Sequence, residues 1–266
     1  MKKRIISALI ALAIVLPAMK VGGAPYNIGV YVVSMLGLKE FLDIKAVRKQ
    51  LPIFIQFIAY IFMTLIVLVD VRTKSMSFTL DYRILSSLFM AFLFPVVFYH
   101  DRKKYSITDA FYMIGGLLFL SISMSLLIII RNISLSILTY LFIIPIFCDT
   151  FAYISGSLVG KTKLLESISP NKTVEGMIFG TIMSVFVGSV FYLTVVDSSF
   201  SVIGIVLITT FLSLIGQLGD LVFSAIKRYF GKKDFSNIMP GHGGILDRLD
   251  SIIFVILGYI FFINII

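Results

Sequence analysis

The densest group of chemically active residues lies between positions 224 and 250. This segment reads SAIKRYFGKKDFSNIMPGHGGILDRLD and combines clustered Lys and Arg, several aspartates, one of the two histidines and a glycine-rich turn. Long apolar runs flank it on both sides. Because charge beside a membrane span is costly unless it is used, the segment is a candidate functional site.

Two features of this segment indicate a phosphate and metal site. The run Pro240-Gly241-His242-Gly243-Gly244 has few side chains, so its backbone N–H groups can approach an anion closely. Asp247 and Asp250 are three residues apart and share a face if a helix begins there. Carboxylates at that spacing can hold a hard cation such as magnesium. The alternative is a glycine turn followed by a solvated helix start.

A second group of polar residues begins inside the apolar run 132–160. Asp149 falls near one end of that run, and Tyr153 and Gly156 lie on the same helical face. An ionisable residue inside a span is a functional candidate, because an unpaired carboxylate is expensive there. The alternative is a structural ion pair with Lys161 or Lys172.

The segment that follows is polar and interrupted by proline. Pro170 breaks a helix, and non-helical backbone at membrane depth must be buried in protein or line a wet cavity. Lys172 and the hydroxyls of Ser169 and Thr173 can then meet a phosphate.

A third group follows the apolar run 198–219. Asp220, Ser224, Lys227 and Arg228 recur at intervals of three and four residues, which places them on one face of a helix.

The elements that must position these residues are apolar helices. The chain has 266 residues, of which 59% are hydrophobic and only 14% are charged, whereas a soluble domain has roughly 25% charged residues. Composition therefore predicts an all-α, polytopic transmembrane helical bundle. The net charge of +9 is explained by basic cytoplasmic loops rather than by nucleic-acid binding. The single cysteine, Cys148, excludes an internal disulfide and is expected to be inert packing.

The uncharged runs predict about nine spans, most of them near the roughly 20 residues that a helical span needs. They cover residues 5–19, 21–38, 50–69, 84–100, 110–130, 132–160, 176–196, 198–219 and 251–266, and only Asp149 interrupts the run 132–160. We expect run 5–19 to be an uncleaved first span, with a cleaved signal peptide as the alternative.

The basic residues predict the orientation. Counted by alternate loops, 18 of the 23 Lys and Arg residues fall on one side. This bias places the N-terminus inside and the C-terminus outside. The polar loops 157–175 and 224–248 then face the cytoplasm, where nucleotides are. We expect residues 1–132 to form about five N-terminal spans and residues 133–266 to form the catalytic part.

Both polar segments closely resemble the signatures of the phosphatidate cytidylyltransferases, integral-membrane enzymes that make CDP-diacylglycerol. In the later segment the matching residues are Ser224, Lys227, Arg228, Lys233, Asp234, Pro240, His242, Gly243, Gly244, Asp247, Arg248 and Asp250. In the earlier one they are the runs Asp149-Thr150-Phe151-Ala152-Tyr153 and Ser169-Pro170-Asn171-Lys172-Thr173-Val174-Glu175-Gly176. The N-terminal half resembles the family only as a set of spans, with Glu40 as a candidate correspondence.

The chain departs from the family pattern in three places. Met239 stands where Ile, Leu or Phe is usual, and Thr162 stands where a histidine is often found. Phe223 stands where the family generally has a glutamate. If that glutamate helps to bind metal or to position a lysine, this chain must manage without it.

The resemblance implies transfer of CMP from CTP to the phosphate of phosphatidic acid at a cell-membrane, cytoplasm-facing site. It implies Mg²⁺ as cofactor, with K⁺ as a candidate second ion. The expected metal ligands are Asp220 and Asp247, with Asp250 and Asp149 as further ligands or orienting groups. The expected phosphate contacts are Lys172, Lys227, Arg228, Arg248 and Lys233. Ser169, Thr173, Ser224, Gly243 and Gly244 complete the expected substrate site, and His242 is expected either to donate a hydrogen bond or to support the turn.

Two other functions remain open. A CTP-dependent lipid kinase would use similar charges but transfer the γ-phosphate to a lipid hydroxyl, which benefits from a general base. A transporter would show inverted repeats and polar groups near the bilayer midplane, and neither is visible. The expected partners are CTP, phosphatidic acid and membrane lipids, without nucleic acid; a homodimer is an open alternative for its assembly.

Overall fold

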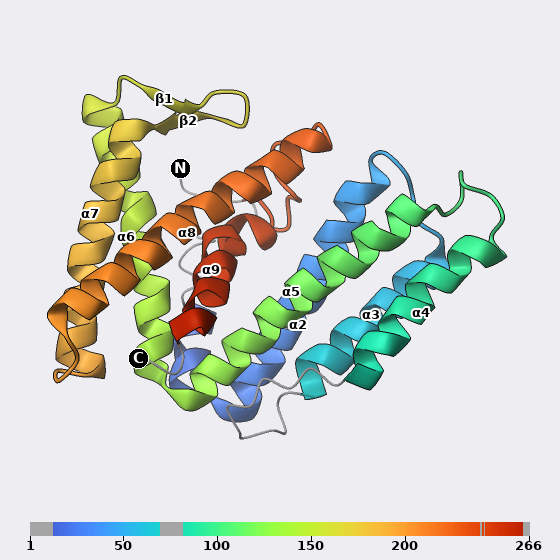
Figure 1. Ribbon diagram of the computed structural model, residues 1–266, viewed down its shortest axis with the longest axis horizontal. Coiled ribbons are helices and arrows are strands. Elements are labelled where there is room, and N and C mark those ends of the chain that lie inside the picture. The colour runs from blue at the N-terminus through green and yellow to red at the C-terminus, as the bar shows by residue number, and fades with distance from the viewer. Residues whose placement is uncertain (1–12, 70–81, 240, 242, 263–266) are drawn as a thin grey trace. The chain divides into compact units, whose positions relative to one another are not determined.

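The protein folds almost entirely into helices, which confirms the predicted all-α class (Figure 1). The computed structural model describes residues 13–69, 82–239, 241 and 243–262. Packing divides the chain into two compact units. Unit 1 comprises residues 1–132 and 234–246, and unit 2 comprises residues 133–233 and 247–266. Each unit is described by itself.

Unit 1 is built from long apolar helices. They are α2 (Gly23–Ala46), α3 (Ile53–Val69), α4 (Tyr82–Phe98) and α5 (Ile107–Ile133). Two tyrosines join α2 to α5 near opposite ends: the Tyr26 hydroxyl donates to the Leu127 carbonyl at 3.2 Å, and the Tyr112 hydroxyl donates to the Phe41 carbonyl at 3.2 Å. The two helices therefore run antiparallel and side by side (Figure 1).

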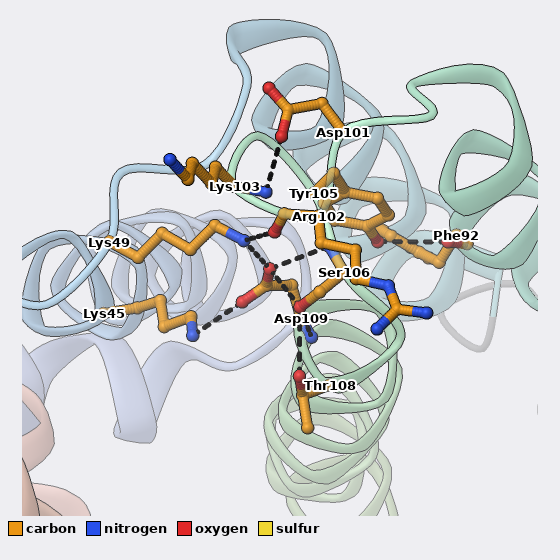
Figure 2. A network of polar contacts seen from close by, with 10 residues as sticks. All are labelled: Lys45, Lys49, Phe92, Asp101, Arg102, Lys103, Tyr105, Ser106, Thr108 and Asp109. Carbon is orange, nitrogen blue, oxygen red and sulfur yellow. Dashed lines mark hydrogen bonds and ion pairs between the residues drawn. The ribbon is translucent and has the colours of Figure 1, made fainter.

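A buried carboxylate organises the start of α5. Asp109 is only 2% exposed, and its side chain forms ion pairs with Lys45 and Lys49 (Figure 2). Its Oδ2 also accepts hydrogen bonds from the N–H of Ser106 at 2.9 Å and from the Ser106 hydroxyl at 2.6 Å. The Ser106 hydroxyl accepts in turn from the Asp109 N–H at 3.3 Å. This reciprocal cap satisfies N–H groups at the helix start, and the ion pairs tie it to Lys45 in the last turn of α2 and to Lys49 just beyond it.

Unit 2 contains the polar segments of the sequence. Its elements are α6 (Leu135–Val159), β1 (Lys163–Leu165), β2 (Ser169–Thr173), α7 (Val174–Phe191), the π-helical turn η1 (Tyr192–Val196), α8 (Val202–Tyr229), α9 (Leu246–Tyr259), whose first residue belongs to unit 1, and the 3-10 turn η2 (Ile260–Phe262). The strands pair antiparallel, with Lys163 opposite Thr173 and Leu165 opposite Ser169. This short hairpin connects the adjacent ends of α6 and α7 (Figure 1).

Small residues allow α6 and α7 to pack closely. A Cβ atom at Gly176 would lie 2.7 Å from the carbonyl oxygen of Ala152, and one at Gly180 would lie 2.6 Å from that of Cys148. Real Cβ atoms do not approach backbone so closely, so only glycine fits at either position. The close packing fixes the separation of the two helices that carry Asp149 and the hairpin end.

Hydroxyl and amide groups recur along one face of α8, one turn apart. They bond to α6 and α7 in succession: Thr209 with Tyr140 at 2.7 Å, Ser213 with Cys148 at 3.5 Å, and Gln217 with Thr181 at 2.7 Å. Because these polar groups pair with one another inside an apolar unit, they avoid the cost of unpaired burial. They also fix the rotation of α8, and so the direction in which its polar end faces within unit 2.

Among the described residues, five helical segments are long and apolar enough to cross a membrane by length and composition. They are Tyr82–Tyr99, Ile107–Ile133, Leu135–Val159, Val174–Val196 and Val202–Tyr229. The count of nine spans and the sides of the termini stay predictions, because much of run 5–19 and the end of run 251–266 lie outside the described residues. The functional division at residue 132 also stays a prediction.

Candidate functional site

A cavity of about 400 Å³ opens in unit 2, where α6, α7, α8 and β2 meet. Its lining contains an aspartate from α6, a lysine from β2 and an aspartate from α8. The lining residues are Asp149, Ala152, Tyr153, Gly156, Ser157, Leu164, Asn171, Lys172, Thr173, Gly176, Met177, Gln217 and Asp220. As the helical spacing predicts, Asp149, Tyr153 and Gly156 line the same space.

An ion pair between Lys172 and Asp220 spans this cavity from β2 to α8. Both side chains remain partly exposed, at 28% and 20%. The neighbouring Thr173 caps α7, since its hydroxyl accepts a hydrogen bond from the Gly176 N–H at 3.1 Å. The cap fixes the end of β2, and so holds the backbone of Lys172 beside the cavity.

Further charges act on this pair. Asp149 interacts electrostatically with Lys172, Asp220 and Arg248. Asp250, which is 9% exposed, interacts electrostatically with Asp220 and with Lys227. Unit 2 therefore brings together like charges from α6, α8 and α9 that repel one another unless cations lie among them. Such an arrangement suits a polyanionic ligand that arrives with a cation.

A second ion pair lies deeper in unit 2. The Lys227 Nζ donates to Asp247 Oδ1 at 2.7 Å, and the two side chains are 10% and 5% exposed. This pair joins the polar end of α8 to the start of α9. A buried pair of this kind needs both partners, because removal of one leaves an uncompensated charge.

The other predicted residues of unit 2 divide between contacts with the protein and exposed positions. The Ser224 hydroxyl donates to Asp220 Oδ1 at 3.4 Å. Arg228 donates to the carbonyl oxygens of Ile168 at 3.2 Å and Lys232 at 3.1 Å, so it ties α8 to the hairpin. The residues with less burial are Ser169, which is half-buried in β2, and Lys233 and Arg248, which are exposed.

The predicted glycine turn belongs to unit 1. Gly241 and Gly243 have φ values of +82° and +84°, which a residue with a side chain rarely adopts. Met239 and Gly243 form an isolated antiparallel bridge across the turn, with the Met239 N–H donating to the Gly243 carbonyl at 3.0 Å. Gly244 is buried beside Glu40. Pro240 and His242 lie outside the described residues.

The donor chemistry fits magnesium, although the protein supplies few ligands. Asp149, Asp220 and Asp250 offer hard carboxylate oxygens, and the described residues contain no group of three or more His, Cys, Asp or Glu side chains placed to hold a metal ion. Magnesium is commonly held by one or two carboxylates together with water and substrate phosphates. The set therefore fits an ion that enters with a nucleotide better than a cage made by protein alone.

Phe223, which departs from the family pattern, is a packing residue here. It is 2% exposed and lies edge-on to Phe254, with 6.3 Å between ring centroids and 84° between planes. Gly219 makes room for the same ring, since a Cβ there would lie 2.6 Å from Phe254. An aromatic contact between α8 and α9 therefore occupies this position.

An apolar groove of about 500 Å³ lies between α7 and α8. Its lining is mostly aliphatic and aromatic: Thr181, Ile182, Val185, Phe186, Ser189, Val190, Leu193, Val202, Val206 and Thr210. Gln217 lines the polar cavity and donates to Thr181, which lines the groove. One hydrogen bond thus marks the boundary between the polar and apolar spaces of unit 2.

Two residues that make hydrogen bonds at these places, Gln217 and Glu40, have no role predicted from the sequence. Gln217 was visible as an amide at the end of an apolar run, directly before Leu218, Gly219 and Asp220. Glu40 was visible in the sequence only as a candidate correspondence with the family, and nothing in its spacing relates it to the glycine turn. Its hydrogen bonds join residues about 200 positions apart in the chain, with |i−j| of 196 to 206.

Comparisons with known proteins point to one family. The model of the cytidylyltransferase family matches residues 2–266. The phosphatidate cytidylyltransferase of Staphylococcus haemolyticus (strain JCSC1435) is 36% identical over 257 residues, which cover 96% of both chains. The proteins of the same name from Staphylococcus saprophyticus subsp. saprophyticus and Staphylococcus aureus (strain COL) are 36% and 34% identical over 256 residues, again covering 96% of each chain.

Proposed function

The chain belongs to the cytidylyltransferase family, and we propose that it transfers CMP from CTP to phosphatidic acid, forming CDP-diacylglycerol and diphosphate. Family membership makes it a nucleotidyltransferase, and its long apolar helices make it a membrane protein. The acceptor and products are proposed from relatives named phosphatidate cytidylyltransferase that are 34–36% identical over nearly the whole chain.

The observation that carries the proposal is the polar cavity of unit 2. Lys172 and Asp220 meet across it, and Asp149 lies in the same lining. A lysine beside carboxylates offers one cation for phosphate and oxygen ligands for a metal ion. These are the residue types that transfer between phosphates requires, because the reaction brings two polyanions together.

The chemistry needs little help from a general base. An oxygen of the lipid phosphate, already ionised near neutral pH, attacks the α-phosphorus of CTP. A new P–O bond forms, the bond between the α- and β-phosphates breaks, and diphosphate leaves with the electron pair. In this proposal Lys172, Lys227, Arg228, Lys233 and Arg248 contact phosphates.

A bound magnesium ion would neutralise phosphate charge and hold the reacting oxygens in line. Asp220 and Asp247 are the proposed ligands, with Asp149 and Asp250 completing or orienting the set. K⁺ is retained as a candidate second ion. Ser169, Thr173 and Ser224 are further proposed substrate contacts of unit 2, and the glycine turn of unit 1 is a proposed phosphate contact.

The apolar groove between α7 and α8 supports a lipid acceptor. Its boundary with the cavity is the bond between Gln217 and Thr181. A lipid whose phosphate lies beside Lys172 can therefore extend an acyl chain along the groove without leaving an apolar surface. Loops 157–175 and 224–248 are proposed to face the cytoplasm, because most Lys and Arg residues lie in loops on their side.

Product analysis tests the proposal. Purified protein in sealed lipid vesicles would receive CTP, magnesium and equal amounts of phosphatidic acid and diacylglycerol. We expect CDP-diacylglycerol and diphosphate in equal yield, with chelation of magnesium abolishing both. Formation of phosphatidic acid and CDP from diacylglycerol would instead identify a lipid kinase, and uptake of CTP into vesicles without either product would identify a transporter.

A further inference from the structure

Glu40 is a fully buried carboxylate outside the set proposed for catalysis. It lies in α2, has an exposed fraction of 0%, and belongs to the same unit as the glycine turn. A carboxylate is costly to bury unless hydrogen bonds compensate it. Its partners therefore indicate which part of the structure it supports.

Those partners lie at both ends of the segment 236–246. Oε1 accepts from the Ser236 hydroxyl at 2.6 Å and from the Ile245 N–H at 2.8 Å, while Oε2 accepts from the Leu246 N–H at 2.8 Å. One side chain thus closes the base of a loop whose tip is the glycine turn. The bond from the Ile238 N–H to the Ser236 hydroxyl, at 3.2 Å, extends this anchor toward the tip.

The backbone at position 244 lies so close to Glu40 that any side chain there would require the carboxylate to move. A Cβ atom at Gly244 would lie 2.6 Å from Oε1 and 2.7 Å from both Cδ and Oε2. The two positive-φ glycines beyond it set the path of the tip.

We propose that Glu40 is a positioning residue that holds the loop 236–246 in the conformation needed to bind substrate phosphate. This inference rests on the proposed function, since it takes the glycine turn as part of the phosphate site. Glu40 acts through the loop and touches no substrate. Small displacements of a positioned group are costly to catalysis, since a misplacement of about 1 Å can lower activity about 100-fold.

Glu40→Gln is the most direct variant, because it keeps the size of the side chain. Both oxygens of Glu40 accept from N–H groups, so an amide must place its own NH₂ group against a donor. We expect faster hydrogen–deuterium exchange in residues 236–246 and a fall in kcat of about 10- to 100-fold per folded molecule. Ser236→Ala removes only one donor, keeps the buried carboxylate, and should lower kcat about 3- to 10-fold.

Asp109→Asn provides the matched control, because Asp109 is a second buried carboxylate with several partners among the described residues of unit 1. We expect it to lower the melting temperature while leaving exchange in 236–246 and kcat per folded molecule unchanged. If Glu40→Gln matches this control in both readouts, the positioning role is overturned. Hydrogen–deuterium exchange needs no turnover. A wild-type protein that does not transfer CMP would overturn the proposed function, and exchange in residues 236–246 would still test the contact between Glu40 and the loop.

Discussion

At the scale of single residues, the buried pair of Lys227 and Asp247 joins α8 to α9, and both residues are proposed to act in catalysis. Its Nζ–Oδ1 distance is 2.7 Å, and neither side chain is more than 10% exposed. Loss of activity in a single variant does not distinguish the loss of a catalytic side chain from misfolding of the site. A single and a double substitution together distinguish the two causes.

We predict that Asp247→Asn lowers the free energy of unfolding by about 3 kcal/mol, because the buried Lys227 loses the opposite charge of Asp247. Adding Lys227→Met should restore much of that stability. Turnover should stay at least about 100-fold below wild type in both proteins, because a charge needed at the reacting phosphates is missing. Thermal unfolding in detergent and initial rates check this; recovery of activity together with stability in the double variant would make the pair purely structural.

At the scale of elements, α8 connects the apolar and polar parts of unit 2. Its polar residues bond α6 and α7 over successive turns, and its end carries Asp220 and Lys227. A helix fixed in rotation along its length presents its terminal charges in a defined direction. The same helix lines both the polar cavity and the apolar groove.

We predict that Val206→Phe, which adds bulk in the groove, raises the KM for long-chain phosphatidic acid several-fold. Short-chain phosphatidic acid should be used as well as by wild type, because its tails do not reach along the groove. Leu207→Phe is the control, since Leu207 is its exposed neighbour on α8 and does not line the groove. Equal effects of Val206→Phe on long-chain and short-chain phosphatidic acid would contradict the proposal that the groove binds an acyl chain.

For the ion pairs of Asp109 at the start of α5, we predict that a substitution lowers stability and leaves kcat unchanged. Asp109→Asn should destabilise the protein by about 3 kcal/mol, because Lys45 and Lys49 lose a buried counter-charge. Asp101→Asn is the comparison, since the Asp101 carboxylate accepts from the Lys103 N–H in an exposed turn and an amide oxygen can replace it (Figure 2). Melting temperatures that fall equally in both variants would contradict the assigned importance of the network.

At the scale of the whole molecule, composition and periodicity predicted more than any single motif. The apolar runs predicted an all-α protein, and the three-to-four spacing placed Asp149, Tyr153 and Gly156 on one cavity wall, as found. The hairpin between α6 and α7 was expected only as non-helical chain, because its strands are short and contain Pro170. The pairing of Lys172 with Asp220 also could not be read from spacing, because it depends on how α8 packs beside β2.

The predicted orientation in the membrane can be tested with residues on either side of the segment formed by α7 and η1. Ser167 lies in the turn of the hairpin and Ser198 lies between η1 and α8, and both are exposed. In a Cys148→Ser background, we expect Ser167→Cys to react with an impermeant maleimide only after the membrane is opened. Ser198→Cys should react in intact cells. The opposite pattern would place the polar loops outside and remove their access to cytoplasmic CTP.

The central claim is that the cavity containing Lys172 and Asp220 supports transfer at the α-phosphorus of CTP. The most direct measurement supplies CTP labelled at either the α- or the γ-phosphorus to wild-type and Asp220→Asn protein, with phosphatidic acid, diacylglycerol and magnesium present. We predict label in lipid from the α position only, reduced at least about 100-fold in the folded variant. Label from the γ position, or an undiminished rate in Asp220→Asn, would contradict the account.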